Sequence, residues 1–318
     1  MFPQNKNDYS GVSMNRRNFL KAGLLTGASL SLPGVYGNYF AKSSSTLAEN
    51  FDMVAVKNGE PEVMFDRGIE QLGGIKTFVK KNQKVLIKPN IGWDVIPERG
   101  GNTHPKLVKR IVEHCYQAGA KDVYVFDHTC DDWRRSYASS GIEKAVKEAG
   151  GKIVSGDSEG YYQSVTINGA KVLSKAKVHE LVLDSDVFIN VPILKSHSST
   201  RLTVTMKNMM GAVWDRGYWH QNNLHQCIAD YALFKKKPNL NVVDAYYVLK
   251  QNGPRGVSKN DVAVMKSMII TTDMVAADSA AAKLFGVEPD SISYIKIADS
   301  MGAGKKDLSA LNIKRLIL

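Results

Sequence analysis

The residues best suited to chemistry lie in one stretch of the sequence, VFINVPILKSHSSTRLTVTMKNMMG. Lys195 and His197 come directly after an apolar run, and Lys207 and Asn208 interrupt a second apolar segment. A polar group among apolar neighbours is costly unless something satisfies it, and imidazole can move a proton or bind a metal. These residue types in this order favour a site that holds a small anionic ligand.

The same side chains also have a simpler interpretation. Lys195 and Lys207 are compatible with surface lysines whose aliphatic stems lie on apolar neighbours, and His197 with a residue that ends a strand. The pattern of the whole stretch, more than any one residue, favours a site.

Buried or alternating apolar segments predict the strands that must position these residues, and amphipathic segments between them predict helices. The alternation of strand and helix predicts an α/β fold with a mostly parallel sheet and helices on both faces. The predicted strands are 53–56, 85–87, 123–126, 152–154, 187–194, 240–243, 268–270 and 313–318. The main predicted helices are 63–72, 105–115, 142–149, one from about 224, and one after Asp273.

Several further polar residues follow predicted strands. Lys88 and Asn90 follow 85–87, Asp127 follows 123–126, and Asp244 follows 240–243. Ligands in open α/β sheets collect at the carboxyl ends of the strands, so we expect these side chains to converge there. Asp127 and Asp244 are candidate ligands of a divalent metal. Asp127 can also orient His128 as a general base. Adjacent residues that leave a strand point apart, which slightly favours an ordinary turn with an exposed histidine.

Two later blocks complete the predicted site. His225 lies near the edge of an apolar helical stripe and ranks above His220 as a candidate. Gly253, within NGPRG, can bring backbone amides close to a ligand, although tight turns need the same residues. The predicted catalytic residues are Lys195, His197, Lys207 and His225, and the predicted cofactor- or ligand-binding residues are Lys88, Asn90, Asn208 and Gly253.

A small antiparallel insert is predicted over about residues 161–184. Asn168-Gly169 is a strong signal for a tight hairpin turn between 165–167 and 171–173. Such a hairpin can cover the site or serve as a partner surface.

The ordered blocks LKSH, MKN with a following glycine, LHQCIAD, PNLNVVDA and NGPRG resemble a bacterial and archaeal family, domain of unknown function 362. The resemblance runs from about Val54 to the end and implies no particular reaction. Some members of that family carry fused ferredoxin-like segments. This chain has three widely spaced cysteines and no CxxC pair, so it carries no iron-sulfur motif and an iron-sulfur role would need a redox protein partner.

The segment SMNRRNFLK resembles a twin-arginine export signal and is followed by a short apolar stretch from Ala22 to Leu32. We therefore predict a signal peptide and linker over residues 1–45, a single α/β domain over 46–318, the twin-arginine translocase as a partner, and a periplasmic or cell-envelope location. No A-x-A cleavage site follows, which leaves a membrane-tethered form open. The alternative is an amphipathic helix that stays attached.

The chain has a formal net charge of +11, which favours anionic partners. Its lysines are dispersed, with no dense basic run carrying interleaved aromatics, and this together with export argues against nucleic acid. Common nucleotide, hydrolase and zinc-protease motifs are absent. We expect an exported protein that binds and acts on a small anionic ligand, with or without a divalent metal. The alternative is a non-catalytic accessory or binding protein for an exported redox enzyme.

Overall fold

A computed structural model describes residues 50–318 of the chain. They belong to a compact unit that covers Glu49–Leu318. The predicted signal peptide and linker, residues 1–45, lie outside the described residues. Among residues 50–318, no helix combines the length and the apolar character needed to cross a membrane.

One large sheet runs through this unit, in the order β12-β1-β11-β10-β7-β2-β3-β4, with β8 beside β10 and β9 beside β8. The run from β10 to β4 is parallel, whereas β11 is antiparallel to both β10 and β1. The predicted mostly parallel sheet is confirmed. The strands are β1 Met53–Lys57, β2 Lys84–Pro89, β3 Asp122–Val125, β4 Lys152–Ile153, β7 Val187–Val191, β8 Ile193–His197, β9 Arg201–Thr203, β10 Leu240–Leu249, β11 Val262–Thr271 and β12 Ile313–Ile317.

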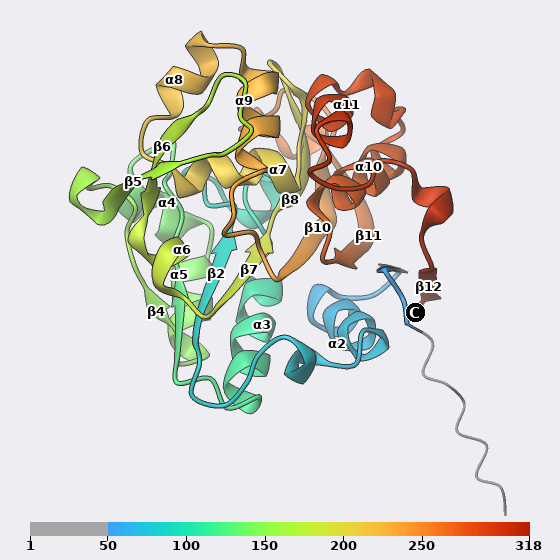
Figure 1. Ribbon diagram of the computed structural model, residues 1–318. Coiled ribbons are helices and arrows are strands. Elements are labelled where there is room, and N and C mark those ends of the chain that lie inside the picture. The colour runs from blue at the N-terminus through green and yellow to red at the C-terminus, as the bar shows by residue number, and fades with distance from the viewer. Residues whose placement is uncertain (1–49) are drawn as a thin grey trace, which may run out of the picture. The chain divides into compact units, whose positions relative to one another are not determined.

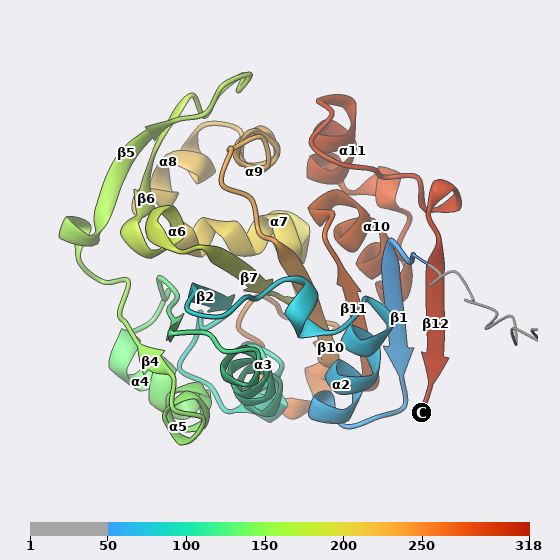
Figure 2. The same cartoon turned by 60° about the horizontal axis from the view of Figure 1, so that its bottom comes forward.

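Helices cover both faces of the sheet, as predicted (Figures 1 and 2). Each helical layer has its own apolar cluster, with Leu107 and Ile111 in one and Ala281 and Ile295 in the other. One layer contains α2 Pro61–Gln71, α3 Pro105–Gln117, α4 Trp133–Ser139 and α5 Ile142–Glu148. The other contains α6 Glu180–Asp184, α7 Thr205–Asn208, α9 Leu224–Tyr231, α10 Met274–Phe285 and α11 Ser293–Ser300.

The segment predicted as one strand over 187–194 forms two strands. Pro192, which has no N–H to donate to a ladder, separates β7 from β8, and its carbonyl accepts the Asp244 N–H at 2.8 Å. All five residues of β7 are buried, as predicted. Because β8 continues beside β10 and pairs with β9, Lys195 and His197 lie within a strand and not beyond its end. Asp244 likewise lies inside the longer β10.

The predicted insert is a two-stranded antiparallel sheet, but its strands differ from the prediction. β5 Tyr162–Thr166 pairs with β6 Lys175–His179, so the connection is longer than a tight turn at Asn168-Gly169. The predicted strand over 171–173 is wrong. The carboxylate of Asp230 accepts the N–H groups of these three residues at 2.7 to 3.0 Å, which removes them from pairing with β5.

Candidate functional site

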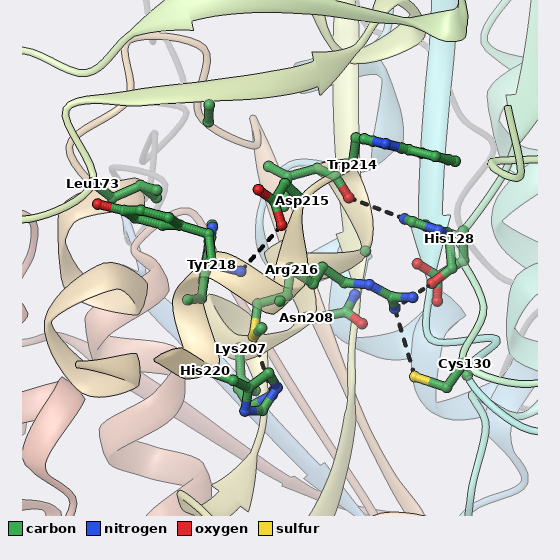
Figure 3. A pocket seen from close by; sticks show the side chains of 18 of the residues that line it. His128, Cys130, Leu173, Lys207, Asn208, Trp214, Asp215, Arg216, Tyr218 and His220 are labelled. Carbon is green, nitrogen blue, oxygen red and sulfur yellow. Dashed lines mark hydrogen bonds between the residues drawn. The ribbon is translucent and has the colours of Figure 1, made fainter. Parts of the chain in front are cut away.

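A cavity of about 1040 Å³ lies at the carboxyl ends of β2 and β3. The turn of α7, the short helix α8 Arg216–Gln221 and the hairpin strand β6 form its other walls. Figure 3 shows side chains that line the cavity, among them those of His128, Lys207, Arg216 and His220. Six predicted site residues line the cavity together: Asn90, Asp127, Lys195, His197, Lys207 and Asn208.

Lys88, a seventh predicted residue, lies behind the cavity wall and not on it. Its Nζ lies 2.7 Å from Oδ1 of Asp127, and the two side chains are 0% and 3% exposed. The other oxygen of Asp127 accepts the Ile91 N–H at 2.7 Å. Burial lowers the pKa of Lys88, and the adjacent carboxylate opposes that shift. The pair therefore joins the ends of β2 and β3 and leaves neither charge free for a ligand.

Gly211 packs directly on this ion pair. A Cβ at Gly211 would lie 1.8 Å from Oδ1 of Asp127 and 2.8 Å from Nζ of Lys88. The Gly211 carbonyl also accepts the His128 N–H at 3.1 Å. The glycine that follows MKNMM is thus required by close approach of the backbone to two side chains.

The ammonium group of Lys195 has neutral partners. Its Nζ donates to Oδ1 of Asn90 at 3.0 Å and to the Gly101 carbonyl at 2.6 Å. The side chain is 2% exposed. Burial lowers the pKa of Lys195 to about 7, with contributions from the charges of Lys207 and Lys88. A bound anion would favour the charged form again.

Lys207 is even less compensated. It is 8% exposed, and the partner of its Nζ is the thioether sulfur of Met210 at 3.1 Å. Thioether sulfur is a weak acceptor, so the ammonium is buried with almost no stabilising contact. Burial lowers the pKa of Lys207 to about 8, and the charge of Arg216 lowers it further.

Arg216, which the sequence analysis did not single out, adds a third cation. Its guanidinium donates to the carbonyls of His128 at 2.8 Å and Thr129 at 2.7 Å, and lies 3.5 Å from Sγ of Cys130. These bonds attach α8 to the loop after β3 (Figure 3). Arg216 begins α8, a six-residue helix too short for apolar periodicity to reveal it.

The carboxylates on the cavity wall are engaged elsewhere. Asp127 pairs with Lys88, Glu159 pairs with Lys177, and Asp215 accepts the Tyr218 N–H at 3.1 Å as the cap of α8. Within residues 50–318, Lys195, Lys207 and Arg216 therefore have no carboxylate partner. The cavity carries an excess of positive charge that suits a phosphate or carboxylate group.

A chain of hydrogen-bonded side-chain amides begins at Asn90, the acceptor of the Lys195 ammonium, and includes Asn208, the residue after Lys207. Asn90 donates to Asn208 at 2.9 Å, Asn208 to Asn190 at 2.8 Å, and Asn190 to Asn241 at 3.2 Å. Asn190 and Asn241 were not predicted. Their signal is an asparagine inside each of the apolar strands VFINV and NLNVV, where a polar side chain needs a buried partner.

Asp278, on α10, holds the helix turn that carries Lys207 and Asn208. Its fully buried carboxylate accepts the N–H of Thr205 at 2.7 Å and of Met206 at 3.2 Å. These are two of the amides that a helix start leaves unsatisfied. Burial raises the pKa of Asp278 to about 7, and the hydrogen bonds from α7 oppose that shift.

His197 lies two residues beyond Lys195 on β8, on the same side of the strand. Its Nδ1 accepts the Ser199 N–H at 3.1 Å, which places the proton of the neutral ring on Nε2. Burial, with the charges of Lys207 and Lys195, lowers the pKa of His197 to about 3. At neutral pH His197 is a neutral hydrogen-bond donor.

An aromatic wall lies beside the cations. The His128 ring stacks on Trp214 with centroids 5.1 Å apart and planes 4° apart, and its Nδ1 lies 3.1 Å from the Val213 carbonyl. The backbone N–H of Trp214 donates to the Lys177 carbonyl on β6 at 3.0 Å. The stacked rings of His128 and Trp214 thus form one wall of the cavity. The backbone bond of Trp214 joins this wall to the hairpin, which also lines the cavity.

Besides Lys88, three further predicted site residues do not line the cavity. His225 stacks on Tyr294 with centroids 6.2 Å apart, and the cavity includes His220 in its place. Asp244 accepts the backbone N–H groups of His104 and Tyr246 at 2.7 and 2.9 Å. The Gly253 N–H donates to Ser196 Oγ at 3.2 Å, and a Cβ there would lie 1.9 Å from the Ser196 carbonyl. Gly253 therefore serves packing against β8.

Within residues 50–318, no group of three or more His, Cys, Asp or Glu side chains is arranged to hold a metal ion. Asp127 and Asp244, the predicted metal ligands, are engaged by Lys88 and by backbone amides respectively. Cys115 and Cys227 are buried, and Cys130 is exposed on the cavity wall.

The family model for the domain of unknown function DUF362 matches residues 85–283. The chain belongs to this family. The match covers the strands, the α7 turn and the loops that supply every cation of the cavity.

One relative and two solved structures are similar to this chain. A thylakoid-associated protein of Synechocystis sp. is 24% identical over 250 residues, which cover 74% of this chain and 73% of that protein. A crystal structure from Thermotoga maritima matches with a TM-score of 0.48 and 12% identity, over 71% of this chain and 60% of that one. Lactate racemase apoprotein from Thermoanaerobacterium thermosaccharolyticum matches with a TM-score of 0.41 and 15% identity, over 73% and 56%.

Proposed function

We propose that this protein binds a small anionic ligand, carrying a phosphate or carboxylate group, in the cavity and acts on it as an enzyme. The buried ammonium of Lys207 carries the proposal, because its hydrogen-bond partner is a thioether and no described carboxylate pairs with it. A buried cation without a counterion is strongly destabilising. A ligand anion between Lys207, Lys195 and Arg216 would supply the missing charge.

The proposed roles follow from the surroundings of each side chain. Lys207 and Arg216 hold the anionic group, and His197 donates a hydrogen bond from Nε2. Lys195 is the group whose protonation changes near neutral pH, as a catalytic group requires. The metal part of the sequence-based prediction gains no support from the donor arrangement, so the proposal relies on these cations alone.

The accessory-protein alternative uses the hairpin as its partner surface. Lys175, Ala176 and Lys177 of β6 instead contribute to the cavity wall, which favours ligand binding over partner binding. A protein partner that co-purifies stoichiometrically with a ligand-free chain would favour the alternative.

Native mass spectrometry of the purified protein, with thermal melts in phosphate, sulfate and citrate, tests the proposal. We expect a co-purified anion, or a rise in melting temperature with at least one of the three, that Lys207→Met abolishes. Lys109→Met is the matched control, because Lys109 lies outside the cavity lining and pairs with Glu148. Equal responses from wild-type protein and Lys207→Met would refute the proposed site.

We further propose that the protein works in the cell envelope after twin-arginine export. The motif around Arg16 and Arg17 supports this, and the Synechocystis relative is named as thylakoid-associated, which fits a setting beside a membrane. A reporter fused behind residues 1–45 should leave the cytoplasm. The same fusion with Arg16→Lys and Arg17→Lys should stay in the cytoplasm. Export of both fusions alike would contradict the assignment.

A further inference from the structure

The surroundings of Lys195 suit an amine that reacts as a nucleophile. A neutral lysine amine has two N–H groups and one lone pair. Both N–H groups of Lys195 have acceptors, Asn90 Oδ1 and the Gly101 carbonyl. The lone pair of this cavity-lining amine is then left without a partner. Burial lowers the pKa of Lys195 to about 7, so the neutral form is well populated at neutral pH.

The other lysines of the site are less suited to this role. Lys88 is paired with Asp127 and lies behind the wall. Lys207 has a higher pKa, about 8, so more of it stays charged at neutral pH. Both hydrogen bonds of Lys195 Nζ are to neutral acceptors, Asn90 Oδ1 and the Gly101 carbonyl. These two bonds orient the nitrogen.

We propose that Lys195 is a catalytic amine that forms an imine with a carbonyl-bearing anion, of which 2-oxo acids are the simplest class. This inference rests on the proposed function, since Lys207 and Arg216 would hold the carboxylate next to the reacting carbonyl. The cavity walls also include Val172, Leu173 and Trp214, which suit an apolar or aromatic group on the same molecule.

The step balances without any further reactant. The lone pair of the neutral Lys195 amine attacks the carbonyl carbon and forms a C–N bond, and the carbonyl π pair moves to oxygen, which takes one of the two amine protons. The C–O bond of this carbinolamine then breaks, and the departing oxygen takes the remaining N–H proton and leaves as water. The products are an imine and one water. We assign to the Nε2–H of His197, which lies on the same side of β8 as Lys195, a hydrogen bond to that oxygen.

Reductive trapping tests the proposal. The full chain is incubated at pH 7.5 with pyruvate or with phenylpyruvate, reduced with sodium borohydride, digested, and mapped by mass spectrometry. We expect a stable adduct on Lys195 at least 10-fold above that on any surface lysine, and competition by sulfate. Mapping the wild-type protein keeps the test valid even where a Lys195 variant fails to fold.

Two variants complete the experiment. Lys195→Arg keeps a long side chain with hydrogen-bond donors but forms no imine, and should lose the adduct. Lys207→Met should weaken 2-oxo acid binding and lower the adduct yield at a given concentration, with recovery at higher concentration.

The outcomes separate this inference from the proposed function. Binding of sulfate or of the 2-oxo acids, lost in Lys207→Met, with no adduct above the surface-lysine level on Lys195, would overturn the imine and leave the anion site standing. Absence of any anion binding would overturn both.

Discussion

Nζ of Lys88 and Oδ1 of Asp127 lie 2.7 Å apart, with both side chains almost fully buried, Asp127 on the cavity wall and Lys88 behind it. The pair links the ends of two parallel strands. Its carboxylate also fixes the loop at Ile91 and contacts the backbone at Gly211. The geometry of the cavity wall therefore depends on this ion pair. Because the two charges neutralise each other, neither is available to bind a ligand.

Replacing Asp127 by Asn should lower the free energy of unfolding by about 3–5 kcal/mol, because Lys88 would remain as a buried unpaired cation. Urea denaturation measures the change. The double variant Lys88→Met with Asp127→Asn should lose less, since it removes the stranded charge. Stability of Asp127→Asn equal to wild type would contradict a buried ion pair here.

Gly211→Ala should destabilise the protein by about 1–3 kcal/mol, the usual range for overpacking, because the added methyl would collide with the Asp127 carboxylate. Gly217→Ala is the control. A Cβ at Gly217 meets its nearest atom at 3.6 Å, so that variant should be neutral or slightly stabilising. Equal thermal denaturation of the two variants would argue against the close approach at Gly211.

Asp278→Asn should lower the free energy of unfolding by about 1–3 kcal/mol, since an amide NH2 would face backbone donors of α7. It should also weaken anion binding, because α7 carries Lys207 and Asn208. Asp273→Ala, which removes the N-cap of α10, should cost about 1 kcal/mol and leave the affinity unchanged. Calorimetric titration alongside denaturation distinguishes the two, and matching affinities would show that Asp278 does not position the site.

Stability and binding should respond to pH in opposite directions. The pKa values of Lys195 and Lys207 are about 7 and about 8 when folded, below the value of an unfolded lysine. The unfolded chain therefore binds more protons above pH 7, and the stability of the ligand-free protein should rise with pH by roughly 1–3 kcal/mol per unit up to about pH 10, where the unfolded lysines lose their protons. Anion affinity should fall over the same range as the cations are lost.

Denaturation of the double variant Lys195→Met with Lys207→Met provides the check on that pH dependence. The rise in stability between pH 7 and 9 should be much smaller in this variant than in the wild type. An identical slope in both would mean that other groups cause it.

The sequence was sufficient for the fold class, because alternating strands and amphipathic helices such as 105–117 leave strong periodic signals. It also indicated six residues that line one cavity. Asn90 and Asp127 follow strands of a parallel sheet, whereas the signal for the other four was a polar side chain next to or within an apolar segment: Lys195, His197, Lys207 and Asn208. Arg216 could not be predicted, because a six-residue helix has no readable period. Trp214 lies in the connection before that helix, where no periodic pattern marks a side chain as part of a site.

Other details depend on contacts between distant parts of the chain. The strand predicted over 171–173 was prevented by Asp230, some 57 to 59 residues further along. The engagement of Asp244 by the His104 amide spans 140 residues. No local pattern encodes either contact.

The most direct test of the anion site is a calorimetric titration of inorganic phosphate and of citrate into the protein at pH 6.5 and low salt, for wild type, Lys207→Met and Lys109→Met. A buried charged hydrogen bond contributes roughly 1.5–3 kcal/mol, or about 10- to 100-fold in affinity. The account predicts one bound equivalent of at least one anion, a loss of that size in Lys207→Met, and no change in Lys109→Met, because Lys109 lies outside the cavity. No binding of either anion, or the same affinity in wild type and Lys207→Met, would contradict it.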